Sequence, residues 1–238
     1  MMALQNKVAI ITGATGGLGT VVTKHLYSEG CKLVLQYQSD KKLSQIPQEI
    51  LDDTSNVITV QADVTQEDQV AHIFNSAIEK FSDVAILCNA VGGYMDTKPF
   101  TDLTLDEWNE MMDRNLTACF LTCREAIRRM KDKNYGRIIN ISAKPGIYPE
   151  AERGAYGVAK SGVAFLSRIL GSEYKKSGIT INAIAPSIIK TPANESWGDP
   201  EDMKNWVTPE QLADTIVFLC SDAAKSVNGA VIEVYGGV

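Results

Sequence analysis

The chain has 238 residues, 45% of them hydrophobic and 22% charged, which suits one large α/β domain over residues 1–238 with a substantial core. Its formal net charge of −6 offers no basic stripe to a phosphate backbone, so no nucleic-acid partner is expected. The first apolar run, residues 8–11, is too short for a signal peptide or a membrane span, so no membrane partner is expected either.

Short β-branched apolar runs alternate along the chain with longer segments of helical period. Their near-continuous hydrophobicity is typical of a parallel sheet covered on both faces. The pattern therefore predicts a doubly wound, Rossmann-type α/β domain with a parallel seven-stranded sheet. The predicted strands are residues 8–12, 32–37, 57–61, 84–89, 137–142, 180–185 and 230–235. The predicted helices are residues 17–29, 66–81, 104–131, 154–176 and 208–221.

The cysteines indicate a reducing compartment. There are five, an odd number, with no C-x-x-C pair, and they lie in apolar stretches where buried thiols are expected. Because the chain has only two histidines, no metal site is expected. A cytoplasmic protein follows as the default expectation.

A glycine-rich turn, T-G-A-T-G-G-L-G, joins the first predicted strand to the first predicted helix. Gly13, Gly17 and Gly19 let backbone N–H groups approach a pyrophosphate at the N-terminus of that helix. A tight strand-to-helix connection alone would explain the same glycines. Their position after the first strand of an alternating α/β chain favours nucleotide binding.

Tyr156 and Lys160 stand four residues apart in A-Y-G-V-A-K-S-G, so on a helix they share one face. A cation beside a phenol favours the phenolate, and we expect Lys160 to lower the pKa of Tyr156 from about 10. Tyr156 is then a candidate proton donor or acceptor. Taken alone, such a pair is usually a solvated surface feature, but the glycine turn strengthens the functional interpretation.

Together these motifs resemble the short-chain dehydrogenase/reductase family over nearly the whole chain. The turn matches the family pattern T-G-x-x-x-G-x-G, and further motifs follow at family spacing. They are Asp63-Val64 after the third strand, Asn89-Ala90 after the fourth, Asn115 in R-N-L-T, Ser142 in I-N-I-S, Tyr156 with Lys160, and residues 182–191 in N-A-I-A-P-S-I-I-K-T.

The resemblance implies four catalytic residues. Tyr156 would exchange the proton with the substrate oxygen while a hydride moves to or from the nicotinamide. Lys160 would bind the nicotinamide ribose, Ser142 would hydrogen-bond the carbonyl oxygen, and Asn115 would hold a water that relays protons to Lys160. The resemblance implies cofactor contacts from Gly13, Thr15, Gly17, Leu18, Gly19, Tyr37, Gln38, Ser39, Asp63, Val64, Asn89, Ala90, Tyr156, Lys160, Ile189 and Thr191.

The end of the second strand, L-V-L-Q-Y-Q-S-D, bears on the cofactor. An NAD-selective site would place an acidic residue at the position of Tyr37 to bind the ribose 2′-hydroxyl. The segment is similar to N-Y-R-S of NADP-using relatives, although Gln38 stands where they have arginine. We therefore expect NADP(H), with NAD(H) possible, and Gln38, Ser39 and Lys41 or Lys42 as phosphate contacts.

The chain departs from the family around the expected substrate entrance. The segment between Ser142 and Tyr156 has one residue more than usual, and Ser187 replaces a glycine. Residues 191–208 correspond to a substrate lid that is shorter than usual and contains Trp197 and Trp206, which suits a small or flat substrate.

Three functions remain open on the sequence. The intact catalytic set favours a small-molecule carbonyl or alcohol substrate, of the 3-oxoacyl or general ketone type. I-L-C-N-A-V-G-G-Y and T-P-A-N-E-S resemble dihydropteridine reductases, which share the short lid. A non-catalytic nucleotide-binding regulator is the third possibility. By analogy with relatives, we expect a homotetramer or a homodimer built on helices 104–131 and 154–176.

Overall fold

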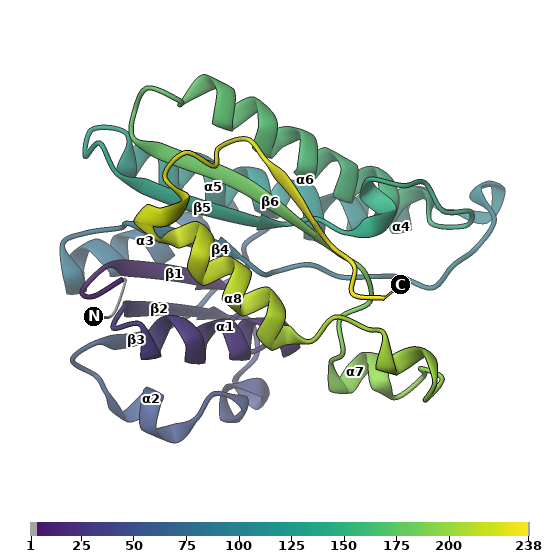
Figure 1. The fold of residues 1–238 in the computed structure, drawn as a ribbon, viewed down its shortest axis with the longest axis horizontal. Coiled ribbons are helices and arrows are strands. Elements are labelled where there is room, and N and C mark those ends of the chain that lie inside the picture. The colour runs from purple at the N-terminus through teal and green to yellow at the C-terminus, as the bar shows by residue number, and fades with distance from the viewer. Residues whose placement is uncertain (1–3, 238) are drawn as a thin grey trace.

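The structure is a computed structural model that describes residues 4–237 except for the side chain of Lys41. Its centre is a seven-stranded parallel sheet in the order β3-β2-β1-β4-β5-β6-β7 (Figure 1). The strands are β1 (Val8–Thr12), β2 (Lys32–Tyr37), β3 (Val57–Gln61), β4 (Ile86–Asn89), β5 (Gly136–Ile141), β6 (Ile179–Pro186) and β7 (Val231–Val234). The predicted doubly wound fold is confirmed, with strand boundaries shifted by at most two residues.

Helices cover both faces of the sheet, as the hydrophobic strands require. Alternate residues of β1 point to opposite faces: Ala9 and Ile11 pack with α1 and α8, whereas Val8 and Ile10 pack with α3, α5 and α6. The helices are α1 (Gly17–Ser28), α2 (Gln48–Asp52), α3 (Glu67–Phe81), α4 (Leu105–Met112), α5 (Ala118–Met130), α6 (Gly154–Glu173), α7 (Pro192–Glu195) and α8 (Pro209–Cys220). The core therefore consists of two apolar layers, one on each side of the sheet.

The strand order reverses at β1, which pairs with β2 on one side and with β4 on the other. The connections leaving the carboxyl ends of β1 and β4 run to opposite sides, and Thr12 pairs in register with Asn89 at these ends. In open α/β sheets the crevice at such a switch point is where ligands bind. The predicted glycine turn and the Asn89-Ala90 motif both begin here.

The predicted continuous helix over residues 104–131 is wrong in one respect. A π-helical turn, Asp113–Thr117, separates α4 from α5. Inside it, the side-chain Nδ2 of Asn115 donates to the carbonyl of Met111 at 3.0 Å, a partner that a backbone N–H would otherwise take. Such local bulges occur often at functional sites, and this one carries a predicted catalytic residue.

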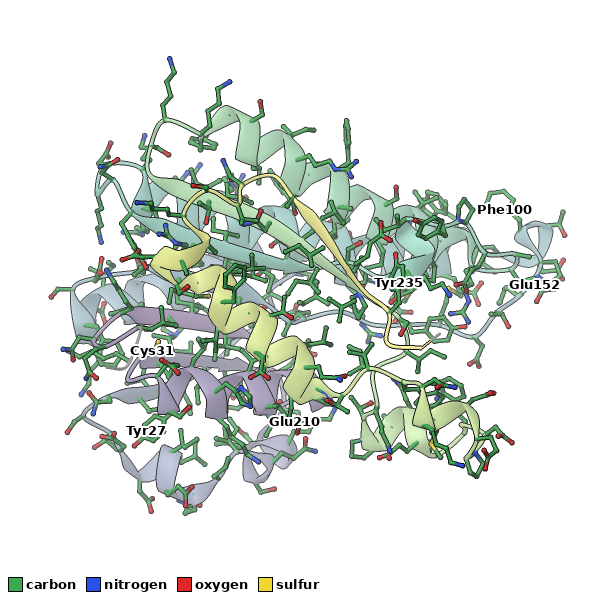
Figure 2. The ribbon with its side chains drawn as sticks, in the orientation of Figure 1. Tyr27, Cys31, Phe100, Glu152, Glu210 and Tyr235 are labelled. Carbon is green, nitrogen blue, oxygen red and sulfur yellow. The ribbon has the colours of Figure 1, made fainter. Side chains whose placement is uncertain are left out.

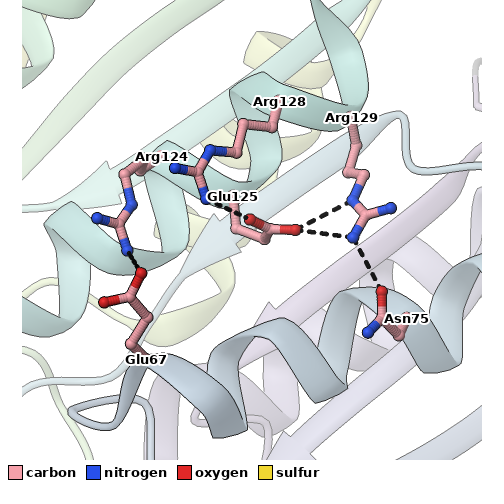
Figure 3. A network of polar contacts seen from close by, with 6 residues as sticks. All are labelled: Glu67, Asn75, Arg124, Glu125, Arg128 and Arg129. Atoms are coloured by element: carbon pink, nitrogen blue, oxygen red, sulfur yellow. Dashed lines mark hydrogen bonds and ion pairs between the residues drawn. The ribbon is translucent and has the colours of Figure 1, made fainter.

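A polar network holds α5 against α3 on one face of the sheet (Figure 3). Arg129 donates to Glu125 at 2.9 Å within α5 and to Asn75 of α3 at 2.9 Å, and Arg124 pairs with Glu67 of α3. Glu125 is only 8% exposed, so its two arginine partners compensate for the loss of water. The network fixes the helix that follows the π-helical turn.

In residues 4–237, no helix combines the length and the apolar character needed to cross a bilayer.

Candidate active site

Hydrogen bonds to Gln36 of β2 hold the glycine turn in place. The N–H of Gly13, which has a positive φ of 65°, donates to Gln36 Oε1 at 2.7 Å, and the N–H of Ala14 donates to the Gln36 carbonyl at 3.0 Å. Gln36 is itself anchored through Nε2 to the Ala62 carbonyl at 2.6 Å. A Cβ at Gly19 would lie 2.0 Å from the Gly13 carbonyl oxygen, so only glycine fits there.

The start of α1 fits a dinucleotide pyrophosphate. Its N-cap, Gly16, supplies no side-chain cap, and the first turn contains no acidic residue. The first N–H groups of α1 are therefore not capped by a side chain, and the helix dipole favours an anion. A Cβ at Gly17 would lie 2.7 Å from Thr191 Cγ2, so two predicted cofactor residues from distant parts of the chain meet at this point.

Two predicted cofactor residues, Asn89 and Asp63, have side chains that are hydrogen-bonded to other residues of the protein. Asn89 is 5% exposed and donates to Asn140 Oδ1 at 2.8 Å, so it ties β4 to β5. Asp63 accepts hydrogen bonds from the N–H and the hydroxyl of Thr65. Tyr37 is partly buried, whereas Gln38 and Ser39 are exposed at the end of β2.

A cavity of about 760 Å³ opens at the carboxyl ends of the central strands. It brings together three of the four predicted catalytic residues, Ser142, Tyr156 and Lys160, with the predicted cofactor residues Leu18, Ala90 and Ile189. Asn115 lines a smaller adjoining cavity with Val64 and Asn89. Among the described residues, the other predicted cofactor positions line neither cavity.

Ser142 and Lys160 are joined directly. The Ser142 hydroxyl donates to the Lys160 backbone carbonyl at 2.7 Å, and Lys160 Nζ donates to the Ile141 carbonyl at 2.9 Å. Both side chains are nearly fully buried, at 1% and 4% exposure. Burial disfavours the charged amine and lowers the pKa of Lys160 from 10.5 to about 8.

Asn115 and Lys160 meet at Gly92. Asn115 Oδ1 accepts the Gly93 N–H at 3.2 Å, and its Nδ2 donates to the Gly93 carbonyl at 3.1 Å. A Cβ at Gly92 would lie 3.0 Å from Asn115 Oδ1 and 3.0 Å from Lys160 Nζ. Because glycine has no side chain, the position that a Cβ would occupy stays open. That position lies within hydrogen-bond distance of both Asn115 Oδ1 and Lys160 Nζ.

The prediction that Lys160 lowers the pKa of Tyr156 is wrong for the protein chain by itself. Burial raises the pKa of Tyr156 from 10.0 to about 12, and the cation that opposes this is Arg153. Lys160 Nζ lies 5.9 Å from the centre of the Tyr156 ring, and its own burial lowers its charge at alkaline pH. Desolvation of the phenolate therefore outweighs the effect of Arg153.

Three residues around Tyr156 escaped the sequence analysis. The Tyr94 ring meets the Tyr156 ring edge-on at 5.2 Å, and the Arg153 guanidinium lies 5.1 Å from the centre of the Tyr94 ring. Arg153 also pairs with Glu150 at 2.7 Å. All three line the large cavity, but they belong to loops whose approach depends on tertiary contacts.

The loops that carry these residues, 90–99 and 147–153, form a projecting arm beside the cavity. The N–H of Lys98 donates to the Glu152 carbonyl at 3.1 Å, and a Cβ at Gly154 would lie 2.8 Å from the Phe100 ring. Figure 2 shows Phe100 and Glu152 together at the end of this arm. The cavity wall also includes Trp197, which is 63% exposed and whose ring lies 5.3 Å from that of the buried Trp206, tilted by 45°.

Comparison with known proteins agrees with this geometry. The family model for short chain dehydrogenases matches residues 7–202. The chain is 32% identical to a 3-oxoacyl-[acyl-carrier-protein] reductase from Synechocystis, over 100% of this chain and 99% of that protein. It is 33% identical to 3beta-hydroxysteroid dehydrogenase 1 from Eggerthella lenta, over 99% and 94% of the two proteins. The crystal structure of levodione reductase superposes with a TM-score of 0.91, at 30% identity and 98% coverage of both chains. The chain therefore belongs to the short-chain dehydrogenase family, whose enzymes transfer a hydride between NAD(P) and a carbonyl or alcohol group.

Proposed function

We propose that the protein is a ketone reductase in which Tyr156 donates the proton and Ser142 positions the carbonyl oxygen. When bound, the nicotinamide supplies the hydride. The observation that carries the proposal is that Tyr156, Ser142 and Lys160 line one cavity large enough for a small substrate beside a nicotinamide. The Synechocystis and Eggerthella relatives support a carbonyl or alcohol substrate of the 3-oxoacyl or general ketone type over a dihydropteridine.

The protonation state of Tyr156 supports its role as the proton donor in the reducing direction. With a pKa of about 12, the phenol keeps its proton at neutral pH and is ready to donate it to a carbonyl oxygen. Lys160 binds the nicotinamide ribose in this proposal. Asn115 and Lys160 return the proton through a water at the point that Gly92 leaves free.

The cofactor preference is proposed to be NADPH. Tyr37 occupies the position where an acid would select NAD, and burial and a hydrogen bond to Asp40 raise its pKa, which supports a Tyr37 hydroxyl that donates to that carboxylate. The nearest carboxylate is thus engaged by Tyr37. Gln38, Ser39 and Lys42 are exposed and available for a 2′-phosphate, whereas the side chain of Lys41, the alternative contact, lies outside the described residues.

Residues 191–208 are proposed as the substrate lid of the single domain. Their base is closed by a parallel bridge between Ile189 and Val207, with the Val207 N–H donating to the Ile188 carbonyl at 3.1 Å. Between these ends lie α7 and the tilted, contacting rings of Trp197 and Trp206. This arrangement supports a short lid that presents an aromatic wall to the substrate.

Assembly and location are proposed from the exposed faces of α5 and α6 and from the cysteines. Phe120 of α5 and Phe165 and Ile169 of α6 are 43%, 64% and 45% exposed, which supports a homodimer or homotetramer built on these helices. The five cysteines are free thiols, which supports a cytoplasmic location.

The experiment that tests the proposed function is a substrate panel. Purified protein should oxidise NADPH in the presence of small ketones, with NADH as a weaker cofactor, and should not turn over quinonoid dihydropterin efficiently. Absorbance at the nicotinamide band measures each reaction. Turnover of the pterin but of no ketone would contradict the proposal.

Gly19→Ala is expected to weaken dinucleotide binding. The methyl group would lie 2.0 Å from the Gly13 carbonyl oxygen and must displace the turn, and losing one charge-assisted hydrogen bond lowers affinity about 10- to 100-fold. Gly16→Ala is the matched control, because its Cβ would lie 3.2 Å from the same oxygen. Calorimetry with NADPH on folded variants measures the effect, and a Gly19→Ala variant that binds as tightly as the wild type would show that the turn does not bind the cofactor.

Arg153 and Glu150 are expected to shift the pH profile in opposite directions. Arg153 lowers and Glu150 raises the pKa of Tyr156, although burial is the larger cause of its shift. Reduction requires the protonated phenol, so the Tyr156 step of the alkaline decline, which lies above the Lys160 step near pH 8, should move to higher pH in Arg153→Met and to lower pH in Glu150→Gln. The exposed Glu152→Gln serves as the control and should leave the profile unchanged. Shifts of the same sign would mean that loss of the ion pair acts through structure rather than charge.

A further inference from the structure

A third cation, besides Lys160 and Arg153, lines the cavity. Lys144 follows Ser142 by two residues and begins the 3-10 turn Lys144–Gly146 after β5. Its carbonyl accepts the N–H groups of Ile147 and Tyr148, at 2.9 and 2.8 Å, so its backbone is held in place. The Lys144 ammonium lies 5.7 Å from the centre of the Tyr235 ring.

Lys144 differs from the other two cations of the cavity in its partners. Lys160 donates to a backbone carbonyl inside the protein, and Arg153 is neutralised by Glu150. Within residues 4–237, no carboxylate lies within ion-pair distance of Lys144. It is the cation of this cavity whose charge is left for a ligand.

The nearby acids do not supply the missing partner. Glu233, the exposed acid of β7, accepts the Tyr148 hydroxyl at 3.3 Å. Asp96, which also lines the cavity, is exposed to solvent, where its charge is screened. Because the whole chain carries a net charge of −6, attraction of an anion has to come from a local group such as Lys144.

We propose that Lys144 binds a carboxylate of the substrate, so that the enzyme acts on oxo acids or the corresponding hydroxy acids. This inference rests on the proposed ketone reductase function and names its substrate class. Two residues of chain span at most about 7 Å, so the Cα atoms of Lys144 and Ser142 lie close together. Both residues line the same cavity, so one small molecule that carries a carboxylate and a carbonyl is the substrate class proposed.

The test compares each acid with its neutral ester. Acetoacetate, 4-oxopentanoate and their methyl esters are assayed with NADPH and the wild-type, Lys144→Met and Lys144→Arg enzymes. We expect the wild type to prefer at least one acid. Lys144→Met should lose about 10- to 100-fold in kcat/KM for that acid, mainly through KM, as expected for a lost charge-assisted hydrogen bond. Its activity on the ester should stay within about twofold, and Lys144→Arg should restore most of the preference.

The outcomes separate this inference from the function on which it rests. If the wild type reduces esters as well as acids, or Lys144→Met affects both alike, the ketone reductase stands and the carboxylate site is overturned. If nothing is reduced, the proposed function fails, and calorimetry then decides the site alone. Acetoacetate should bind the wild-type enzyme with NADPH more tightly than it binds Lys144→Met, and equal or absent binding overturns the site.

Discussion

Tyr156→Phe should reduce ketone reduction by about 10² to 10⁴ while leaving NADPH affinity nearly unchanged, because it removes only the hydroxyl that donates the proton. The ring and its edge-on contact with Tyr94 at 5.2 Å are kept, so the cavity should retain its shape. Single-turnover rates with saturating NADPH measure the effect on the chemical step. A calorimetric titration measures cofactor binding separately.

Tyr94→Phe is the matched control for this prediction. It removes a hydroxyl from the same cavity wall, but Tyr94 is 46% exposed and is assigned no proton transfer. Its rate should stay close to that of the wild type. A Tyr156→Phe enzyme with most of its activity would instead support an imine substrate, for which the hydroxyl contributes less.

Lys160→Met should nearly abolish turnover and at the same time make the protein more stable. In the folded protein burial lowers the pKa of Lys160 from 10.5 to about 8, a difference that corresponds to about 3 kcal/mol at neutral pH. Methionine has no charge to desolvate, but it leaves the Ile141 carbonyl without its Nζ donor, which costs about 1–3 kcal/mol. The net gain should therefore be about 0–2 kcal/mol, at most several degrees in Tm.

The sign of this effect is also visible in the pH dependence of stability. Below pH 8 Lys160 is charged in both the folded and the unfolded protein, so folding carries the full cost of desolvating its ammonium group. Between about pH 8 and 10.5 the unfolded chain binds more protons, so the free energy of unfolding should rise with pH in the wild type. Lys160→Met should lack this rise, and the exposed, ion-paired Lys204→Met should keep it. A lower Tm for Lys160→Met at pH 7 would contradict the argument.

The elements of the fold could be predicted because each carries its own local signal. The run of β1 is apolar on both faces, which is the pattern of a buried parallel strand. The start of α8 is marked by Thr208, whose hydroxyl accepts the Gln211 N–H at 3.3 Å, and by proline at the first helical position. The short helices α2 and α7 were missed because four or five residues give too little periodicity.

The break between α4 and α5 could not be predicted from local signals. The segment reads as one amphipathic helix, and the π-helical turn depends on Asn115 bonding both Met111 of its own helix and Gly93 of a distant loop. A sequence window contains the first partner but not the second. The motif placed Asn115 at the site, and its hydrogen bonds follow only from the fold.

The sequence by itself predicted the parallel α/β architecture and the glycine turn, because hydrophobic period and motif spacing are properties of the chain. Its resemblance to the short-chain dehydrogenase/reductase family implied the four candidate catalytic positions. Only the tertiary structure decided the electrostatics of the site. Burial of Tyr156 raises its pKa to about 12, opposite to the effect expected from a lysine one helical turn away, since desolvation depends on everything packed around the ring. The same holds for Lys144 and Arg153, because whether a cation has a carboxylate partner depends on loops that meet only in the folded protein.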